Sequence, residues 1–153
     1  MTERSERDLV TVDKAIIRAL QEDGRAPYSK LGPAVGLSQA AVRQRVQRLV
    51  ESGVMQVVAV TDPALLGLGL QAMVGITVQG DVKAVAGALA AVPDCEYVVI
   101  TAGRFDLLVE VVAADTGALL HLVNDQIRAI PGVTSTEVFT YLSLVKQTYA
   151  WGV

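Results

Sequence analysis

The sequence predicts an α+β protein with two parts: an N-terminal helix-turn-helix and a C-terminal βαββαβ sandwich of the ferredoxin-like kind. Three observations lead to this fold class. Apolar residues recur at helical spacing in the first part, whereas β-rich runs alternate with two helical runs in the second. The charge also changes sign, because residues 1–53 carry nine Lys/Arg against seven Asp/Glu and residues 54–153 carry four against nine. We therefore expect the first part to face an anionic partner.

Three helices are expected within residues 1–53. Asp13 is the expected N-cap of the first, in which Ile16, Ile17 and Leu20 recur at helical spacing before Gly24 ends it.

The second and third helices are separated by a tight turn. Ser29 is the expected N-cap of the second helix and Gly36 its end, while Ser38 caps the third and Gly53 ends it. This order of a short helix, a VGLS turn and a polar helix is typical of a helix-turn-helix.

The third helix combines an apolar stripe with a polar arc. The stripe consists of Val42, Val46, Leu49 and Val50. Arginine on the arc can bind phosphate or guanine and glutamine can pair with adenine, although a merely solvated helix face would look similar. The predicted DNA-contacting residues are Ser38, Gln39, Ala40, Arg43, Gln44, Gln47 and Arg48.

The second part is expected to contain four strands and two helices. Residues 71–79 form the first strand, and Asp81 caps a helix that runs to Val92. Residues 95–102 and 105–113 form a hairpin across Gly103-Arg104, and residues 133–146 form the last strand. Asp115 caps the second helix, whose expected buried arc is Leu119, Leu122, Val123, Gln126 and Ile130.

Two helices can cover only one face of this sheet, yet the last strand has apolar residues on both sides. One side has Val138, Leu142 and Leu144, and the other has Phe139, Tyr141 and Val145. A monomer rarely exposes so large an apolar patch, so we expect at least a homodimer.

With these elements in order, the chain resembles the leucine-responsive regulatory protein/asparagine synthetase activator (Lrp/AsnC) family, also called feast/famine regulators. The resemblance extends from Val12 to Tyr149 and rests on VDKAIIRALQEDGR, LSQAAVRQRVQRLVESGVM, TAGRFDLLV and IPGVTSTEVF. It implies a winged helix-turn-helix over 1–53, a strand linker (VMQVVAV) within 54–70, and an effector-binding and oligomerisation domain over 71–153. Gly32-Pro33 departs from the family pattern, which usually has helix formers there.

The same resemblance implies a transcriptional regulator that binds double-stranded DNA and a small-molecule effector, an amino acid, between subunits. It also implies dimers that assemble into octamers or similar rings. Gly103 and Asp106 match the G-x-aromatic-D turn of the family's effector site, and Thr136 is a weaker match. The last-strand positions that set the effector response correspond to Phe139, Thr140 and Tyr141. Alternatively, Gly103 is a hairpin glycine with positive φ, Asp106 stabilises the turn, and Phe139 and Tyr141 are dimer core.

Enzymatic chemistry has little support in the sequence. One His and one Cys cannot build a Cys/His zinc site or a disulfide within one chain, and no P-loop or G-x-G-x-x-G appears. Asp106 and Glu110 lie four residues apart on a strand, but no nucleophile or base accompanies them. We therefore expect no catalysis, no metal and no cofactor.

Two alternatives remain open. The architecture also resembles siroheme decarboxylase subunits, which need histidines and basic residues, whereas this chain has only His121, on a polar arc. A nucleoid-architectural protein that binds DNA widely through phosphate contacts, with weak sequence preference, is a further alternative.

The sequence carries no recognisable targeting or membrane segment. The N-terminus is charged and lacks an apolar signal region, and the longest uncharged run, 63–80, contains proline, glutamines and glycines. We expect a cytoplasmic, nucleoid-associated protein without a membrane partner.

Overall fold

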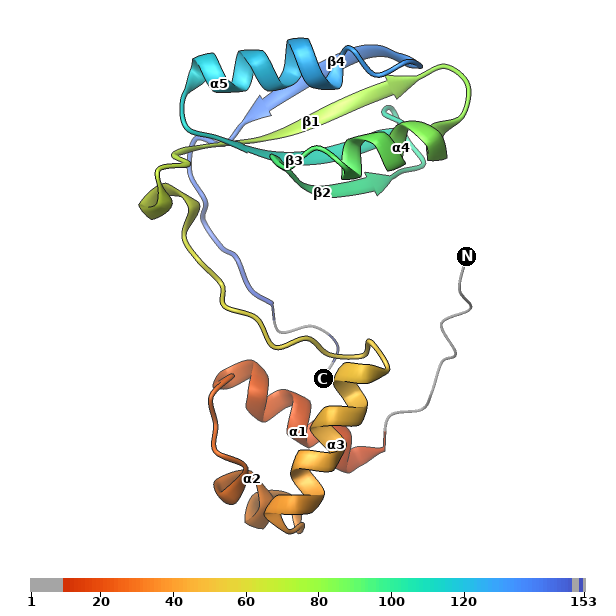
Figure 1. Cartoon of the computed structure of the whole chain (residues 1–153). Coiled ribbons are helices and arrows are strands. Elements are labelled where there is room, and N and C mark those ends of the chain that lie inside the picture. The colour runs from red at the N-terminus through yellow and green to blue at the C-terminus, as the bar shows by residue number, and fades with distance from the viewer. Residues whose placement is uncertain (1–9, 150–151, 153) are drawn as a thin grey trace. The chain divides into compact units, whose positions relative to one another are not determined.

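The structure, a computed structural model, describes residues 10–149 and residue 152, and the chain divides into two compact units (Figure 1). One unit combines residues 1–60 with the C-terminal residues 146–153, and the other spans residues 61–145. The tail thus belongs to the same unit as the N-terminal helices, although it follows the last strand in the sequence.

The first unit is a three-helix domain. Helix α1 spans Thr11–Glu22, α2 spans Tyr28–Val35 and α3 spans Gln39–Glu51. Ile16, Leu31, Val42 and Val46 form its buried core. Val50, predicted on the apolar stripe, is instead 43% exposed. The helix-turn-helix expected from the sequence is confirmed.

Two of the predicted helix caps are wrong. The N-cap of α1 is Val10 rather than Asp13, and that of α2 is Pro27 rather than Ser29. Both helices follow a residue in extended conformation that provides no side-chain cap. Asp13 instead lies in the first turn of α1, where its negative charge interacts favourably with the positive end of the helix dipole. The cap of α3 is confirmed, because Ser38 Oγ accepts a hydrogen bond from Ala41 N at 3.2 Å.

Gly32 makes the tight packing of α2 against the following turn possible. A Cβ added at this position would lie 2.5 Å from the carbonyl oxygen of Leu37, and Leu37 N donates to the carbonyl oxygen of Gly32 at 2.8 Å. Gly36 then ends α2 with a φ of 70°, a left-handed conformation that glycine adopts without strain. The departure of Gly32 from the family pattern therefore has a steric reason.

The predicted strand linker is wrong for the single chain. Residues 54–62 contain no strand, and the first ordered element after α3 is a short 3₁₀ helix, η1, over Pro63–Leu66. A β-strand exists only beside a hydrogen-bonded neighbour, and this segment has none within the described residues. For the same reason the first unit lacks the strands of a winged helix in the described part of the chain.

The second unit is a four-stranded antiparallel sheet in the order β2-β3-β1-β4. Its strands and helices follow the predicted βαββαβ order, and the bounds are β1 Leu70–Val78, α4 Val82–Ala90, β2 Cys95–Ile100, β3 Leu107–Ala113, α5 Thr116–His121 and β4 Val133–Thr140. Side chains of α4, α5 and the sheet share one core, so both helices cover the same face (Figure 1). The caps Asp81 and Asp115 are confirmed.

The end of the second helix and the last strand differ from the prediction. A π-helical segment, η2 (Leu122–Ile127), continues α5, and Arg128 N donates to the carbonyl oxygen of Val123. This wider turn shifts the buried arc by one residue, so Ile127 is fully buried whereas Gln126 is half-buried. The last strand ends at Thr140 rather than at residue 146.

Candidate nucleic-acid interface and effector region

The predicted DNA-contacting residues lie together on the open side of α3. All seven are exposed: Ser38, Gln39, Ala40, Arg43, Gln44, Gln47 and Arg48. The opposite side of the helix is held in the core by Val42, Val46 and Leu49. The N-terminal end of α3 and two arginines are therefore free of the protein core, which a helix that enters a DNA groove requires.

Arg45 differs from the neighbouring arginines. Its Nη1 donates to Asp13 Oδ1 at 2.8 Å, and both side chains are less than one-third exposed. On the exposed arc, Gln47 Nε2 donates to Glu51 Oε1 at 2.8 Å. The structure thus separates Arg45, which joins α3 to α1, from Arg43 and Arg48 on the exposed arc.

The turn that precedes β3 forms hydrogen bonds with the C-terminal end of β1. Asp106 Oδ2 accepts a hydrogen bond from Val78 N at 2.7 Å, and Asp106 N donates to the carbonyl oxygen of Ile76 at 3.0 Å. Thr101 Oγ1 donates to the carbonyl oxygen of Phe105 at 2.6 Å. One carboxylate oxygen of Asp106 therefore has a structural role, as the alternative interpretation expected.

Gly103 lies in the same turn but does not need to be glycine for conformational reasons. Its φ is not positive, and a Cβ added there would meet no heavy atom within 4 Å. The interpretation of Gly103 as a hairpin glycine with positive φ is therefore wrong. The space beside Gly103 is open instead.

An aromatic contact that the sequence analysis missed connects this turn to β4. The rings of Phe105 and Phe139 pack edge to face with centroids 6.1 Å apart, and a Cβ at Gly75 would lie 2.6 Å from Phe105 Cδ2. Arg104 lies 5.2 Å from the Phe105 ring centroid and also pairs with Glu137 at 2.8 Å. The available signal was the glycine inside the β1 run, since such a glycine often marks a close approach.

The six predicted effector residues do not form one cluster within the single chain. Asp106 and Thr136 both lie beside Ile76 of β1, whereas Tyr141 N donates to the carbonyl oxygen of Gln71. Ile76 and Gln71 are five residues apart on β1, which corresponds to about 17 Å along a strand. Phe139 lies between them and reaches the turn through Phe105.

The face of the sheet opposite the helices is partly apolar and solvent-exposed. Tyr97 is 59% exposed and Phe139 is 44% exposed.

Tyr141 interacts with Glu110. Burial of Tyr141, together with the Glu110 carboxylate that accepts its hydroxyl hydrogen bond, raises the pKa of Tyr141 above its ordinary value. Glu110 therefore contacts Tyr141, while Asp106 is bonded to β1, so the structure gives these two carboxylates different partners.

His121 and Cys95 both lie outside the two candidate sites. His121 is exposed and its Nδ1 lies 2.8 Å from Asp125 Oδ2, as expected for the polar arc. Cys95 is partly buried against the core, and burial followed by the charges of Asp94 and Glu96 raises its pKa to about 11. No group of three His, Cys, Asp or Glu side chains within the described residues is placed to hold a metal ion. Among these same residues, no helix is both long and apolar enough to cross a membrane.

The fold and the exposed α3 define a helix-turn-helix DNA-binding protein with a C-terminal α+β domain. A family model for an AsnC-type helix-turn-helix domain matches residues 11–50, and one for a C-terminal dimeric alpha+beta barrel domain matches residues 70–153. The chain belongs to the Lrp/AsnC family of transcriptional regulators.

Individual relatives agree with this assignment over nearly the whole chain. The HTH-type transcriptional regulator FL11 of Pyrococcus horikoshii is 34% identical and covers 90% of this chain and 91% of its own length. The Leucine response regulatory protein (LrpA) of Mycobacterium tuberculosis is 31% identical, with a TM-score of 0.81 over 91% of this chain and 96% of that one. A Neisseria meningitidis transcriptional regulator, solved as an L-Met complex, is 27% identical, with a TM-score of 0.82 over 92% and 94%.

Proposed function

We propose that this regulator contacts DNA through α3 and that an amino acid bound between subunits adjusts its affinity or assembly. The observation that carries the DNA part is the common exposure of all seven predicted α3 residues. Arg43 and Arg48 supply phosphate or guanine contacts, and Gln44 and Gln47 supply base-edge contacts. Arg45 is not part of this proposal because Asp13 pairs with it.

The effector part is supported by the turn around Asp106. One of its carboxylate oxygens bonds Val78 N, and the other faces the ammonium group of an amino acid in our proposal. Open space beside Gly103 leaves room for the ligand. The relative solved with L-Met is consistent with an amino-acid effector.

A dimer accounts for the distance between the two groups of effector residues. Thr140 and Tyr141 lie at the other end of β1 from Asp106. We propose that the exposed sheet face packs against a second subunit, which brings Phe139, Thr140 and Tyr141 of one chain near the turn of another. The dimeric domain named by the family match supports this pairing, and octamers or similar rings are its proposed higher assembly.

A thermal-shift screen against the twenty amino acids tests the effector proposal. A ligand present at 100 times its dissociation constant adds about 2.7 kcal/mol of stability, which moves the melting temperature measurably. Any amino acid that stabilises the protein is then titrated against DNA affinity. Stabilisation by none of the twenty would contradict the amino-acid proposal, while DNA binding in the same preparation tests the α3 proposal separately.

A further inference from the structure

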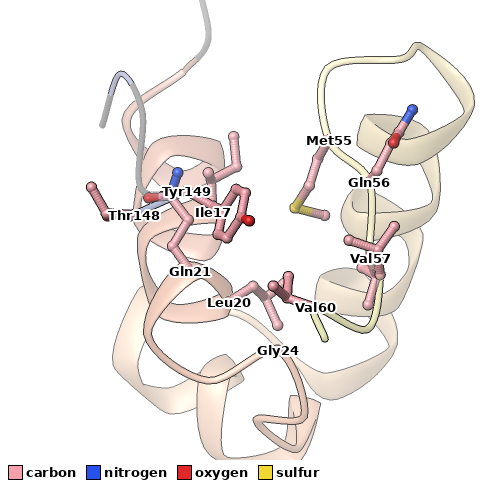
Figure 2. Close-up of a pocket in the computed structure, with 11 residues that line it drawn as sticks. Ile17, Leu20, Gln21, Gly24, Met55, Gln56, Val57, Val60, Thr148 and Tyr149 are labelled. Carbon is pink, nitrogen blue, oxygen red and sulfur yellow. The ribbon is translucent and has the colours of Figure 1, made fainter. Parts of the chain in front are cut away.

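An amino-acid effector is a zwitterion, so its site needs a cationic group for the carboxylate as well as Asp106 for the ammonium group. The pocket of about 350 Å³ between α1 and residues 55–60 does not meet this need (Figure 2). The described side chains that line it are apolar or neutral, as Leu20, Met55 and Gln56 illustrate. A charged ligand would lose hydration there without gaining a charged partner. This pocket is therefore unsuited to an amino acid, whereas the turn around Asp106 offers a charge.

One cationic side chain of the second unit belongs to this turn. Residues 61–145, all of which the structure describes, contain three lysine and arginine residues. Lys83 lies in α4 and Arg128 follows η2, whereas Arg104 lies between Gly103 and Phe105. Because α4 and η2 pack against the core on the helix-covered face of the sheet, Arg104 is the candidate cation for a ligand bound at the turn.

Two contacts hold Arg104 on the exposed face of the sheet. Its Nη2 donates to Glu137 Oε2 at 2.8 Å, and its guanidinium carbon lies 5.2 Å from the centroid of the Phe105 ring. Glu137 lies opposite Gly75 in the β1–β4 register, and the next residue of β1, Ile76, is buried in the core beneath the helices. Successive side chains of a strand point to opposite faces, so Glu137 and the guanidinium that it binds lie on the face away from the helices.

Asp106 and the Arg104–Glu137 pair lie at neighbouring positions along β1. Asp106 N donates to the carbonyl oxygen of Ile76, and Glu137 lies opposite the preceding residue, Gly75. Consecutive positions are about 3.4 Å apart along a strand. An α-amino acid carries its ammonium and carboxylate groups on one carbon, and each charge-assisted hydrogen bond adds about 2.7–2.9 Å. One ligand can therefore reach both Asp106 and Arg104.

We infer that Arg104 binds the carboxylate of the effector and that Glu137 occupies Arg104 until the ligand displaces it. The inference rests on the proposed function, because it assigns a partner to the second charged end of the same ligand. Arginine suits this role, since its planar fork binds a carboxylate through two parallel hydrogen bonds. The exchange costs little, because the Arg104 and Glu137 side chains are 77% and 42% exposed and such ion pairs contribute little to stability. The ligand class is thus an amino acid with a free carboxylate.

Isothermal titration calorimetry of the full-length protein tests this inference. The probes are the amino acids that stabilise wild type in the thermal-shift screen, together with their carboxamides, which lack the negative charge. Wild type should bind each carboxamide about 10-fold to 100-fold more weakly than the amino acid. In Arg104→Met the amino acid should lose about the same factor, and its advantage over the carboxamide should disappear. Arg128→Met is the matched control, because it removes an exposed arginine of the same unit and should keep the wild-type affinities.

Glu137→Gln removes the competing carboxylate and should bind the amino acid up to about fivefold more tightly than wild type. Far-ultraviolet circular dichroism confirms that each ligand-free variant is folded, and Arg104→Gln serves as a second variant at the same position. A preference over the carboxamide that is as large in the folded Arg104 variants as in wild type would overturn the inference and leave the amino-acid effector in place. Weaker binding by Glu137→Gln would overturn the competition. Stabilisation of wild type by none of the amino acids would contradict the proposed function, and the inference with it.

Discussion

Arg45 Nη1 donates to Asp13 Oδ1 at 2.8 Å, and this ion pair joins the candidate recognition helix to the first helix of the domain. The two side chains are 28% and 18% exposed, so water screens the pair only partly. The arginines of α3 consequently have different roles. Arg45 orients the helix, whereas Arg43 and Arg48 remain exposed for a ligand.

We predict that Asp13→Ala lowers the free energy of unfolding by about 1 kcal/mol, since it leaves Arg45 unpaired at a partly buried position. Chemical denaturation of wild type, Asp13→Ala, Arg45→Met and the double variant measures the coupling between the two residues. Lys14→Ala, which changes an exposed neighbour, is the control. A coupling energy of zero would show that the pair does not stabilise the domain.

Arg48→Ala should weaken binding to every DNA sequence and reduce the salt dependence. The expected change in the slope of log K against log [salt] is about 1, as for the loss of one phosphate contact. Fluorescence anisotropy with a labelled duplex at several salt concentrations measures this slope. Arg128→Ala removes an exposed arginine from the other unit and should leave the slope unchanged. Equal slopes for Arg48→Ala and wild type would refute a phosphate contact at this position.

Tyr141→Asp should dissociate the proposed dimer or prevent its folding, because it places an unpaired carboxylate next to Glu110 in the buried interface. Burial of such a charge costs several kcal/mol. Tyr141→Phe keeps the ring and should remain dimeric. Sedimentation velocity at micromolar concentration distinguishes the two variants. A folded, monomeric wild-type protein under the same conditions would contradict the dimer itself.

Alanine should destabilise the protein at Gly75 but have little effect at Gly103. Gly75→Ala puts a Cβ 2.6 Å from the Phe105 ring, so the ring must move away from Phe139, at an expected loss of about 1–3 kcal/mol. Gly103→Ala meets no atom within 4 Å and should change stability by less than about 0.5 kcal/mol. Urea denaturation of both variants measures the difference. Similar losses at both positions would show that the Phe105 contact does not decide the effect.

The sequence alone predicted the start of a helix correctly wherever one local interaction determines it. Ser38, Asp81 and Asp115 were recognisable as caps because each side chain accepts a backbone N–H two or three residues later. The sequence did not predict the bounds of a helix where these depend on packing against other parts of the chain. The π-helical turn that buries Ile127 and the extended start of α1 at Val10 leave no local signature.

The same distinction applies to the site. Helical spacing predicted the exposed positions of Gln44, Gln47 and Arg48 on α3. It did not show that Arg45 is paired with Asp13, thirty-two residues away, or that Phe105 packs over Gly75. Contacts between distant segments depend on the register of the strands and the packing of the helices, which periodicity does not specify.

Asp106→Asn separates the two roles considered for Asp106. The carboxylate already accepts a hydrogen bond from Val78 N at 2.7 Å, and an asparagine carbonyl oxygen can accept the same bond. The variant should therefore fold and bind DNA like wild type. If the ligand's ammonium group binds the second carboxylate oxygen, the loss of a charge-assisted hydrogen bond of about 1.5–3 kcal/mol should lower effector affinity by about 10-fold to 100-fold.

The effector that emerges from the thermal-shift screen is titrated against DNA affinity in wild type and Asp106→Asn. Asp125→Asn is the matched control, because Asp125 is exposed and pairs with His121. The effector response should shift to higher concentration in Asp106→Asn alone. An unchanged response would leave Asp106 with only its bond to Val78, because the substitution preserves that bond while it removes the charge and replaces the second acceptor oxygen by an amide donor.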